Sequence, residues 1–326
     1  MKRNPVALLV LLASIGLSAC GRAVPSTLTP VTLMLDWVPN TNHTGIFVAQ
    51  SRGYFAEAGL QVNIIQPGEV YAEQAVAAGA ADFGVSFQEQ ITLARADAIP
   101  LVSIAAILQH NTSGFASRAE LAAQSPADWA GLRYGSFGSP FEEPTLRVLM
   151  TCDGGDFSRL EIVETGFADP LSLLAEDQTD LAWIFFGWQG LQAEQLGIDL
   201  NIVMMQDWLD CIPDYYTPVL IASEATIAER PQIVRAFLQA VSRGYQEAIQ
   251  DPQAAAEVLF QAAPELDLAL IRASQAWISP RYQAEAARWG EQEPSVWENY
   301  ASWMVDHGIL PAPIDPSAAF TNEYLP

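Results

Sequence analysis

Strand-like apolar runs alternate with helix-like stretches along most of this 326-residue chain, and this alternation limits the folds it can adopt. Before Thr226 such runs occupy residues 31–35, 61–65, 83–85, 101–108, 133–135, 160–165, 181–185, 201–205 and 219–223. After Thr226, apolar residues recur at spacings of three and four, which is typical of helices. Alternating strands and helices predict βαβ units, so we expect an α/β fold with mostly parallel sheets flanked by helices.

The first residues have the features of a bacterial secretion signal. Lys2 and Arg3 precede a short apolar run, which is followed by Leu-Ser-Ala-Cys ending at Cys20. This resembles a lipobox, so we expect residues 1–19 to be removed, Cys20 to be lipidated and residues 20–30 to form a tether. The lipid would anchor the protein at the extracytoplasmic face of the cell membrane. Ordinary cleavage beside an incidental cysteine is the alternative.

The chain is strongly acidic, with 15 Lys+Arg against 38 Asp+Glu and a formal charge of −23. Nucleic-acid partners are therefore not expected, because phosphates require basic contacts. Lys2 is the only lysine, and it lies in the predicted signal. Much of the acidity is explained by a solubilising surface charge.

The segment 35–60, LDWVPNTNHTGIFVAQSRGYFAEAGL, combines a strand end, a polar loop and a helix. Ligands of open α/β sheets bind where strands end and helices begin. We therefore expect ligand contacts from this loop, although its polar residues could simply cap the helix. The candidates are Asp36, Trp37, Asn40, Asn42 and His43.

This segment resembles the periplasmic solute-binding proteins of ABC importers. GYFAEAGL, at residues 53–60, is similar to nitrate, sulfonate and taurine binders, whereas DWVPNTNHTG, at residues 36–45, resembles the vitamin subgroup that captures thiamine pyrimidine precursors. The likeness extends more loosely from residue 31 to beyond Tyr216. It implies a two-lobed, type II-like fold with a hinge of two crossing segments, a small-molecule vitamin ligand, and an ABC permease with its ATPase as partners.

A repeated pattern is consistent with two lobes. Residues 75–84 and 173–182 each combine a helix end, a turn, an Asp and an apolar strand. With the resemblance, this predicts lobe one from residues 31–115 plus 216–326 and lobe two from residues 116–215. The hinge is expected near residues 113–117 and 212–218, where a ligand could close the lobes on itself.

Two later loops are further candidates for the ligand site. Residues 135–144, GSFGSPFEEP, join a strand to a helix and offer Ser139 and Glu142, with a plain turn as the alternative. Residues 180–190, DLAWIFFGWQG, carry a strand into Phe186, Trp188 and Gln189. We expect Ile184 and Phe185 to lie in the core.

Gln189 departs from the pyrimidine binders that the chain resembles, in which a glutamate follows the Gly-Trp pair and accepts the exocyclic amine. A carboxamide both donates and accepts hydrogen bonds. It therefore suits the pyrimidinedione edge of a flavin, and large aromatics suit a tricyclic ring. Riboflavin is the first prediction for the ligand and a formylaminopyrimidine thiamine precursor the second.

Further candidates come from strand ends and from the expected hinge. Phe87 and Gln88 follow the strand at residues 83–85, and Tyr216 lies in the second crossing segment. With Cys20 lipidated, Cys152 and Cys211 remain in an oxidising compartment and are predicted to pair, with free thiols as the alternative.

Catalysis is a minor alternative. Thiamine-pyrimidine synthases resemble this fold and use pyridoxal phosphate on a lysine, which the predicted mature chain lacks. With three histidines, no zinc spacing or Ser/His/Asp order is present. We expect no cofactor, no metal and no catalytic residue.

Overall fold

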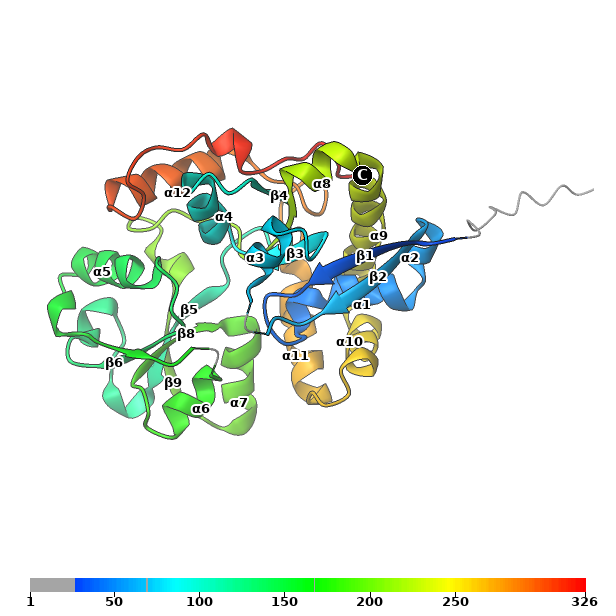
Figure 1. Ribbon diagram of the computed structural model, residues 1–326. Helices are drawn as coiled ribbons and strands as arrows, with labels where there is room; N and C mark the ends of the chain where they lie inside the picture. The colour runs from blue at the N-terminus through cyan, green and yellow to red at the C-terminus, as the bar shows by residue number, and fades with distance from the viewer. Residues whose placement is uncertain (1–26, 69, 167) are drawn as a thin grey trace, which may run out of the picture.

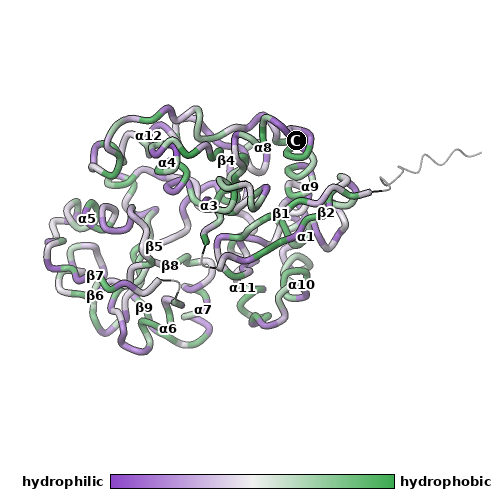
Figure 2. The backbone as a smooth tube through the Cα atoms, in the orientation of Figure 1, coloured by the Kyte–Doolittle hydropathy of each residue, from purple (hydrophilic) through white to green (hydrophobic). Residues whose placement is uncertain are grey.

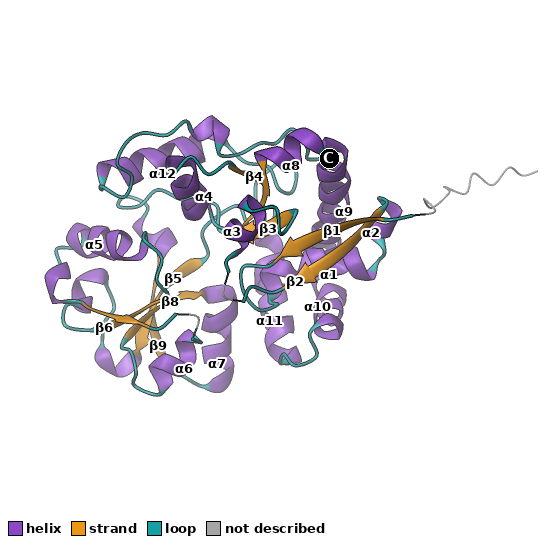
Figure 3. Ribbon diagram, in the orientation of Figure 1, coloured by secondary structure: helices purple, strands orange, loops and turns teal. Residues whose placement is uncertain are grey.

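The computed structural model describes residues 27–68, 70–166 and 168–326. The predicted signal, the lipidation site at Cys20 and most of the tether lie outside these residues. The described chain folds into two α/β lobes, each built on a five-stranded sheet with helices on its faces (Figures 1 and 3).

Lobe one is built on a sheet with the strand order β2-β1-β3-β10-β4. Its strands are β1 (Thr29–Met34), β2 (Leu60–Ile65), β3 (Phe83–Ser86), β4 (Leu101–Ala106) and β10 (Val219–Ser223). Its helices are α1 (Thr44–Ser51), α2 (Tyr54–Glu57), α3 (Ala72–Ala77), α4 (Gln88–Ala96), α8 (Glu224–Glu229), α9 (Pro231–Gln250), α10 (Pro252–Ala262) and α11 (Leu268–Ile278).

Lobe two is built on a sheet with the order β7-β6-β8-β5-β9. Its strands are β5 (Ser113–Arg118), β6 (Arg133–Ser136), β7 (Glu161–Glu164), β8 (Leu181–Phe185) and β9 (Leu200–Met204). Its helices are α5 (Glu142–Cys152), α6 (Pro170–Ala175) and α7 (Leu191–Leu196), and α12 (Pro294–Asp306) belongs to the C-terminal segment. Short helical turns are η1 (Thr41–His43), η2 (Ala119–Leu121), η3 (Pro126–Trp129), η4 (Phe157–Arg159), η5 (Phe186–Gly190), η6 (Met205–Trp208), η7 (Ser279–Arg281) and η8 (Pro316–Ala318).

Both sheets are mixed, but most strands in each run in one direction. In lobe one β10 is antiparallel to β3 and β4, and in lobe two β5 is antiparallel to β8 and β9. The other neighbouring pairs are parallel. The reversed strands are the ones that follow a crossing between lobes, so the expected two-lobed fold with two crossovers is confirmed.

The first crossing lies earlier than expected. Ser113 already pairs with Phe185 in the sheet of lobe two, so the chain crosses within residues 107–112. The expected crossing at residues 113–117 is therefore wrong, because this stretch is a buried central strand. The second crossing follows η6 and includes residues 212–218, as expected.

The core of lobe one depends on α9, whose apolar face packs on the sheet. The Phe237 ring stacks on Phe83 with centroids 3.9 Å apart. Figure 2 shows hydrophobic and hydrophilic residues alternating along the outer helices, as expected when one helix face is buried. Helix α9 also lies very close to α1, since a Cβ on Gly244 would lie 1.9 Å from the Gly45 carbonyl oxygen. Any larger residue at position 244 would push the two helices apart.

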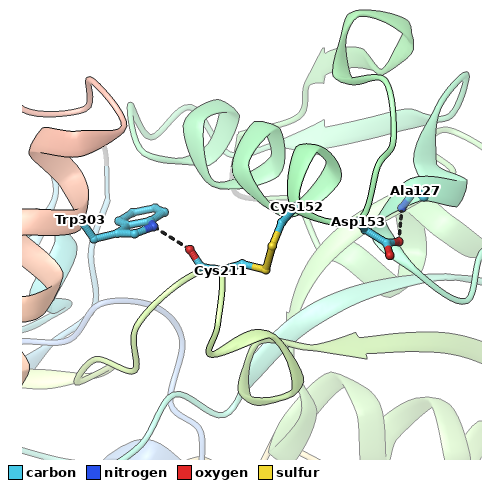
Figure 4. The surroundings of a disulfide bond; sticks show 5 residues. All are labelled: Ala127, Cys152, Asp153, Cys211 and Trp303. Atoms are coloured by element: carbon cyan, nitrogen blue, oxygen red, sulfur yellow. Dashed lines mark hydrogen bonds between the residues drawn. A yellow bond between two sulfur atoms is a disulfide. The ribbon is translucent and has the colours of Figure 1, made fainter.

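The C-terminal segment contacts lobe two as well as lobe one. The Trp303 indole of α12 donates to the Cys211 carbonyl at 2.8 Å, and Tyr300 packs against Tyr215. Cys211 itself forms a disulfide with Cys152 at the end of α5, with a Cα–Cα distance of 6.2 Å (Figure 4). This bond closes a loop of lobe two immediately before the second crossing.

Candidate functional site

A cleft with an empty volume of about 1150 Å³, its open mouth included, lies between the two lobes. Its walls come mainly from the ends of β1 and β3 in lobe one and of β6 and β8 in lobe two, where ligands of α/β proteins bind. The principal lining residues are Asp36, Trp37, Asn40, Asn42, Tyr71, Glu73, Phe87, Glu89, Gln90, Ser113, Phe137, Ser139, Phe141, Trp183, Phe185, Trp188, Gln189 and Thr217.

The loop after β1 is held by its own side chains. Asn40 caps the helical turn η1, because its Oδ1 accepts the Asn42 backbone N–H at 2.9 Å. Asn40 and Asn42 also line the cleft, with Asp36 and the half-buried Trp37. The sequence alternative was a cap at Thr41 or Asn42, whereas the structure places the cap at Asn40, which also lines the cleft.

His43 lies behind the cleft wall rather than in it. Its Nδ1 accepts the Asn40 backbone N–H at 3.2 Å, so its Nε2 carries the proton and donates to Asp36 Oδ1 at 2.6 Å. The ring is fully buried. Contrary to expectation, His43 is not placed to contact a ligand, and instead fixes the orientation of Asp36, which does line the cleft.

Glu142 also supports the wall without forming it. Its carboxylate accepts hydrogen bonds from the Tyr134 hydroxyl at 2.6 Å and from the backbone N–H groups of Ser139 and Phe137 at 2.6 and 3.1 Å. Burial raises the pKa of this carboxyl, whereas the hydrogen bonds act in the opposite direction. Glu142 was expected to contact the ligand. Its carboxylate instead makes the hydrogen bonds that hold the loop carrying Ser139.

Two contacts bridge the cleft between the lobes. The Gln90 Nε2 of α4 donates to Ser139 Oγ of lobe two at 3.1 Å. The rings of Phe87 and Phe185 stack with centroids 6.3 Å apart. Lobe one and lobe two therefore touch across the cleft through residues that also line it.

Strand β8 directs alternate side chains to the cleft. Trp183 and Phe185 line the cleft, and Ile184 between them is buried in the sheet core. The expectation that Phe185 belongs to the core is wrong. Phe186 starts the turn η5 and packs against Trp277 of α11 at 5.3 Å, away from the cleft that it was expected to line.

Gln189 lies at the cleft with its amide orientation fixed. Its Oε1 accepts the Phe185 backbone N–H at 3.0 Å, so the carbonyl is used within the protein. The free amide hydrogens of Nε2 are what it can offer to a ligand. One of the two acceptor sites of the carbonyl oxygen is thus already used, which weakens the expected donor-and-acceptor pairing with a ligand edge.

Gln88 and Tyr216 join the hinge to lobe one and do not line the cleft. The Gln88 Oε1 accepts the Tyr216 backbone N–H at 2.8 Å, and the Tyr216 carbonyl accepts the Gln88 backbone N–H at 3.1 Å. The Tyr216 hydroxyl in turn accepts the Glu293 backbone N–H at 2.7 Å. Both side chains are buried, so these two candidates have structural roles. The next residue, Thr217, does line the cleft.

The cleft is acidic on the side of lobe one. Asp36, Glu73 and Glu89 line it, and none of its described lining residues is Lys, Arg or His. Burial raises the pKa of Glu73, which also accepts a hydrogen bond from the Ser86 hydroxyl, and raises the pKa of Glu89 to about 8. Such a cleft disfavours anionic ligands and favours ligands with N–H or O–H donors.

Eight of the thirteen residues expected to contact a ligand therefore line the cleft. They are Asp36, Trp37, Asn40, Asn42, Phe87, Ser139, Trp188 and Gln189. Important residues that were not expected are Glu73 on α3, Gln90 on α4, and Phe137, Phe141 and Trp183 in lobe two. The strict alternation of β8 could have identified Trp183 together with Phe185, whereas no local signal distinguishes Glu73 from a surface acid.

Comparisons with known proteins agree with this architecture. The chain belongs to the family described as NMT1/THI5 like, whose model matches residues 40–255. It is 30% identical to the formylaminopyrimidine-binding protein of Halalkalibacterium halodurans over 96% of this chain and 97% of that protein. It is 26% identical to the riboflavin-binding protein RibY of Chloroflexus aurantiacus, over 92% of this chain and 87% of that protein.

A further relative and one solved structure show the range of this fold. The 4-amino-5-hydroxymethyl-2-methylpyrimidine phosphate synthase of Legionella pneumophila is 26% identical over 93% of this chain and 95% of that protein. The solved structure of the alkanesulfonate-binding protein SsuA from Xanthomonas axonopodis has a TM-score of 0.70 at 14% identity, covering 91% of this chain and 99% of that chain. The fold is therefore that of the periplasmic binding proteins, as the sequence predicted.

Proposed function

We propose that this protein is the solute-binding subunit of an ABC importer and captures a planar, vitamin-type heterocycle between its lobes. An aminopyrimidine precursor of thiamine, such as formylaminopyrimidine, is the ligand that the cleft supports best. The observation that carries this proposal is the pairing of aromatic walls with three carboxyl groups, and no Lys, Arg or His is among the lining residues that the structure describes. Rings stack on the aromatic faces, and the carboxyl groups accept hydrogen bonds from ring amines.

Riboflavin is the second candidate. The wide aromatic lining suits a tricyclic ring, and a riboflavin-binding protein is among the relatives. The sequence favoured riboflavin because a carboxamide at Gln189 both donates and accepts hydrogen bonds. Because the Gln189 carbonyl already accepts the Phe185 N–H, Gln189 favours riboflavin less strongly than the sequence indicated, and the acidic cleft favours an aminopyrimidine.

A binding role is favoured over catalysis. A Schiff base with pyridoxal phosphate needs an amine side chain, and the only lysine of the sequence is Lys2. Gln189, Trp37 and Trp188 have no acid–base chemistry of their own, but they suit recognition. The formylaminopyrimidine-binding relative is also more similar to this chain, at 30% identity, than the Legionella synthase, at 26%.

Domain closure is the proposed mechanism. A ligand that contacts Trp37 and Asn42 in lobe one and Trp183 and Gln189 in lobe two stabilises the state in which both lobes touch it. Closure is favoured only by the difference in affinity between the closed and open states. The contact between Gln90 and Ser139 adds a direct link across the cleft. The closed form would then present the ligand to the permease and its ATPase.

We propose further that lipid on Cys20 anchors the protein at the extracytoplasmic face of the membrane. Within the described part of the chain, no helix has the length and apolar character needed to cross a bilayer. Mass spectrometry of the protein from a bacterial membrane fraction tests the anchor. A diacylated N-terminal Cys20 is expected, and a Cys20→Ser variant should appear in the soluble fraction.

Tryptophan fluorescence tests the proposed function, because Trp37, Trp183 and Trp188 line the cleft. Saturable quenching by formylaminopyrimidine at micromolar concentration or below is expected. An alkanesulfonate serves as the matched negative control, since the acidic cleft should exclude it. Saturable binding of the sulfonate without any response to formylaminopyrimidine or riboflavin would contradict the proposal.

A further inference from the structure

Glu89 is a buried acid at the cleft with an unmatched oxygen. It lies in the first turn of α4, is 3% exposed, and lines the cleft. Its Oε2 has no hydrogen-bond partner among the described groups. A buried, unpaired polar atom is destabilising, so natural proteins rarely retain one without a reason.

The other two cleft acids differ from Glu89 in this respect. Asp36 is hydrogen-bonded to His43, and Glu73 to Ser86. Of the described residues that line the cleft, Glu89 is the one that holds a buried side-chain nitrogen or oxygen without a partner. This oxygen without a hydrogen-bond partner therefore belongs to a residue of the cleft wall, where a bound ligand could donate a hydrogen bond to it.

None of the described groups that act on the Glu89 carboxyl is a cation. The Tyr215 hydroxyl of the second crossing opposes the rise of the Glu89 pKa, and it also interacts with Asn111 of the first crossing. The other titratable groups that act on Glu89 are Glu73 and the fully buried Tyr300, neither of which is a cation. Tyr215 is thus a positioning residue that links the cleft acid to both crossing segments.

We propose that Glu89 Oε2 accepts an N–H of the bound heterocycle and makes the protein selective for an amine-bearing ring over the same ring without its amine. This inference rests on the proposed function and identifies the group that recognises the amine. It also gives the cleft the carboxylate that position 189 lacks in this chain. The geometry places this acceptor on lobe one, whereas Gln189 is on lobe two.

Titration calorimetry of the purified protein with two probes tests this inference. The probes are formylaminopyrimidine and its des-amino analogue, which carries hydrogen in place of the ring amine. The wild-type protein should prefer the amine by roughly tenfold to a hundredfold, the range for a hydrogen bond to a charged group. In Glu89→Gln this preference should fall to a few-fold or less. Asp97→Asn, an exposed acid just after the same helix, is the matched control and should keep the wild-type preference.

Proton release gives a second readout that does not depend on a variant folding. Burial raises the pKa of Glu89 to about 8, so much of it is protonated at pH 7 before ligand binds. Because the ionised carboxylate is needed to accept an N–H, ligand binding should release protons from Glu89. Proton release is detected as a heat of binding that varies with the ionisation enthalpy of the buffer. Affinity for formylaminopyrimidine should then rise from pH 7 to pH 9. His110 at the hinge also titrates near this range, so Glu89→Gln is measured alongside the wild-type protein where it folds.

The outcomes separate this inference from the proposed function. No binding of formylaminopyrimidine by the wild-type protein would refute the aminopyrimidine function. Tight wild-type binding with no preference for the amine, or with the same preference in Glu89→Gln, would overturn the role of Glu89 alone. If Glu89→Gln does not fold, absence of proton release by the wild-type protein would likewise overturn it.

Discussion

His110 Nδ1 lies 2.5 Å from Asp214 Oδ2, and this contact joins the two segments at which the chain crosses between the lobes. Asp214 also accepts the backbone N–H of Asn111 at 3.0 Å. A second carboxylate, Glu285, lies 3.0 Å from His110 Nε2. The hinge is therefore held together by a histidine between two acids.

This arrangement predicts a pH-dependent hinge. The hydrogen bond with Asp214 is the main cause that raises the pKa of His110 from 6.5 to about 9, with Glu285 adding to it and burial opposing it. The ion pairs of protonated His110 stabilise the folded state fully below pH 6.5, and this stabilisation is lost as the pH rises through 9. We expect a contribution of about 1 kcal/mol, because the His110 side chain is 39% exposed and its ion pairs are screened. Urea unfolding of the wild-type protein and of His110→Gln, at pH 6 and at pH 10, measures this contribution to the free energy of unfolding. The wild-type protein should be more stable than the variant at pH 6 and lose that advantage at pH 10. The same difference in free energy at both pH values would contradict the prediction.

Trp37 follows β1 and Trp188 lies in η5 after β8, and both line the cleft, so each should provide a stacking surface for the ligand. Trp37→Ala and Trp188→Ala are each expected to weaken ligand binding by about 1–3 kcal/mol through lost burial and stacking. Trp37→Ala should leave the unfolding midpoint nearly unchanged, because Trp37 is only half-buried. Calorimetric titration measures affinity. Unchanged affinity in both variants would exclude these rings as the stacking site.

Phe185 and Phe186 are adjacent in sequence, but their rings pack in different surroundings. Phe185 lines the cleft and stacks with Phe87, whereas Phe186 packs against Trp277. Phe185→Ala should therefore weaken ligand binding about tenfold or more, an effect of the size expected when a stacked aromatic is removed. Phe186→Ala, the matched control, should lower the free energy of unfolding with little effect on affinity. The opposite pattern would show that η5 is oriented differently in the ligand-bound state.

Gln189 provides a test that separates the two candidate ligands. In Gln189→Glu one carboxylate oxygen can still accept the Phe185 N–H, while the other replaces the amide donor that faces the cleft. Affinity for formylaminopyrimidine is expected to rise by about 1 kcal/mol, the typical net value of one hydrogen bond. Affinity for riboflavin is expected to fall, because its ring carbonyls lose a donor. A fall in affinity for both ligands would show that Nε2, and not an acceptor, is required at position 189.

The sequence was sufficient for the fold and for the loops of the site because both depend on local patterns. Alternating apolar runs predicted the strands, and polar residues at strand ends predicted the cleft. Trp37, Asn40 and Ser139 line the cleft, as these patterns indicated. The reversed strands β5 and β10 follow the crossings, whose positions depend on long-range pairing that local patterns do not encode.

The orientation of individual side chains was not predictable in the same way. His43, Glu142 and Gln88 are polar residues at strand ends, yet each is hydrogen-bonded to backbone groups that hold the wall of the cleft. Whether such a residue faces a ligand or supports the loop depends on which backbone N–H groups fold against it. Glu89 illustrates the converse case, since its importance follows from one oxygen that the fold leaves without a partner.

The most direct test of the account is a calorimetric titration of the purified protein with formylaminopyrimidine and, separately, with riboflavin. We expect submicromolar, one-to-one binding of formylaminopyrimidine and weaker binding of riboflavin. Tight binding of riboflavin with no heat from formylaminopyrimidine would contradict the recognition of an amine by the acidic cleft. Binding of neither would contradict the proposed function itself.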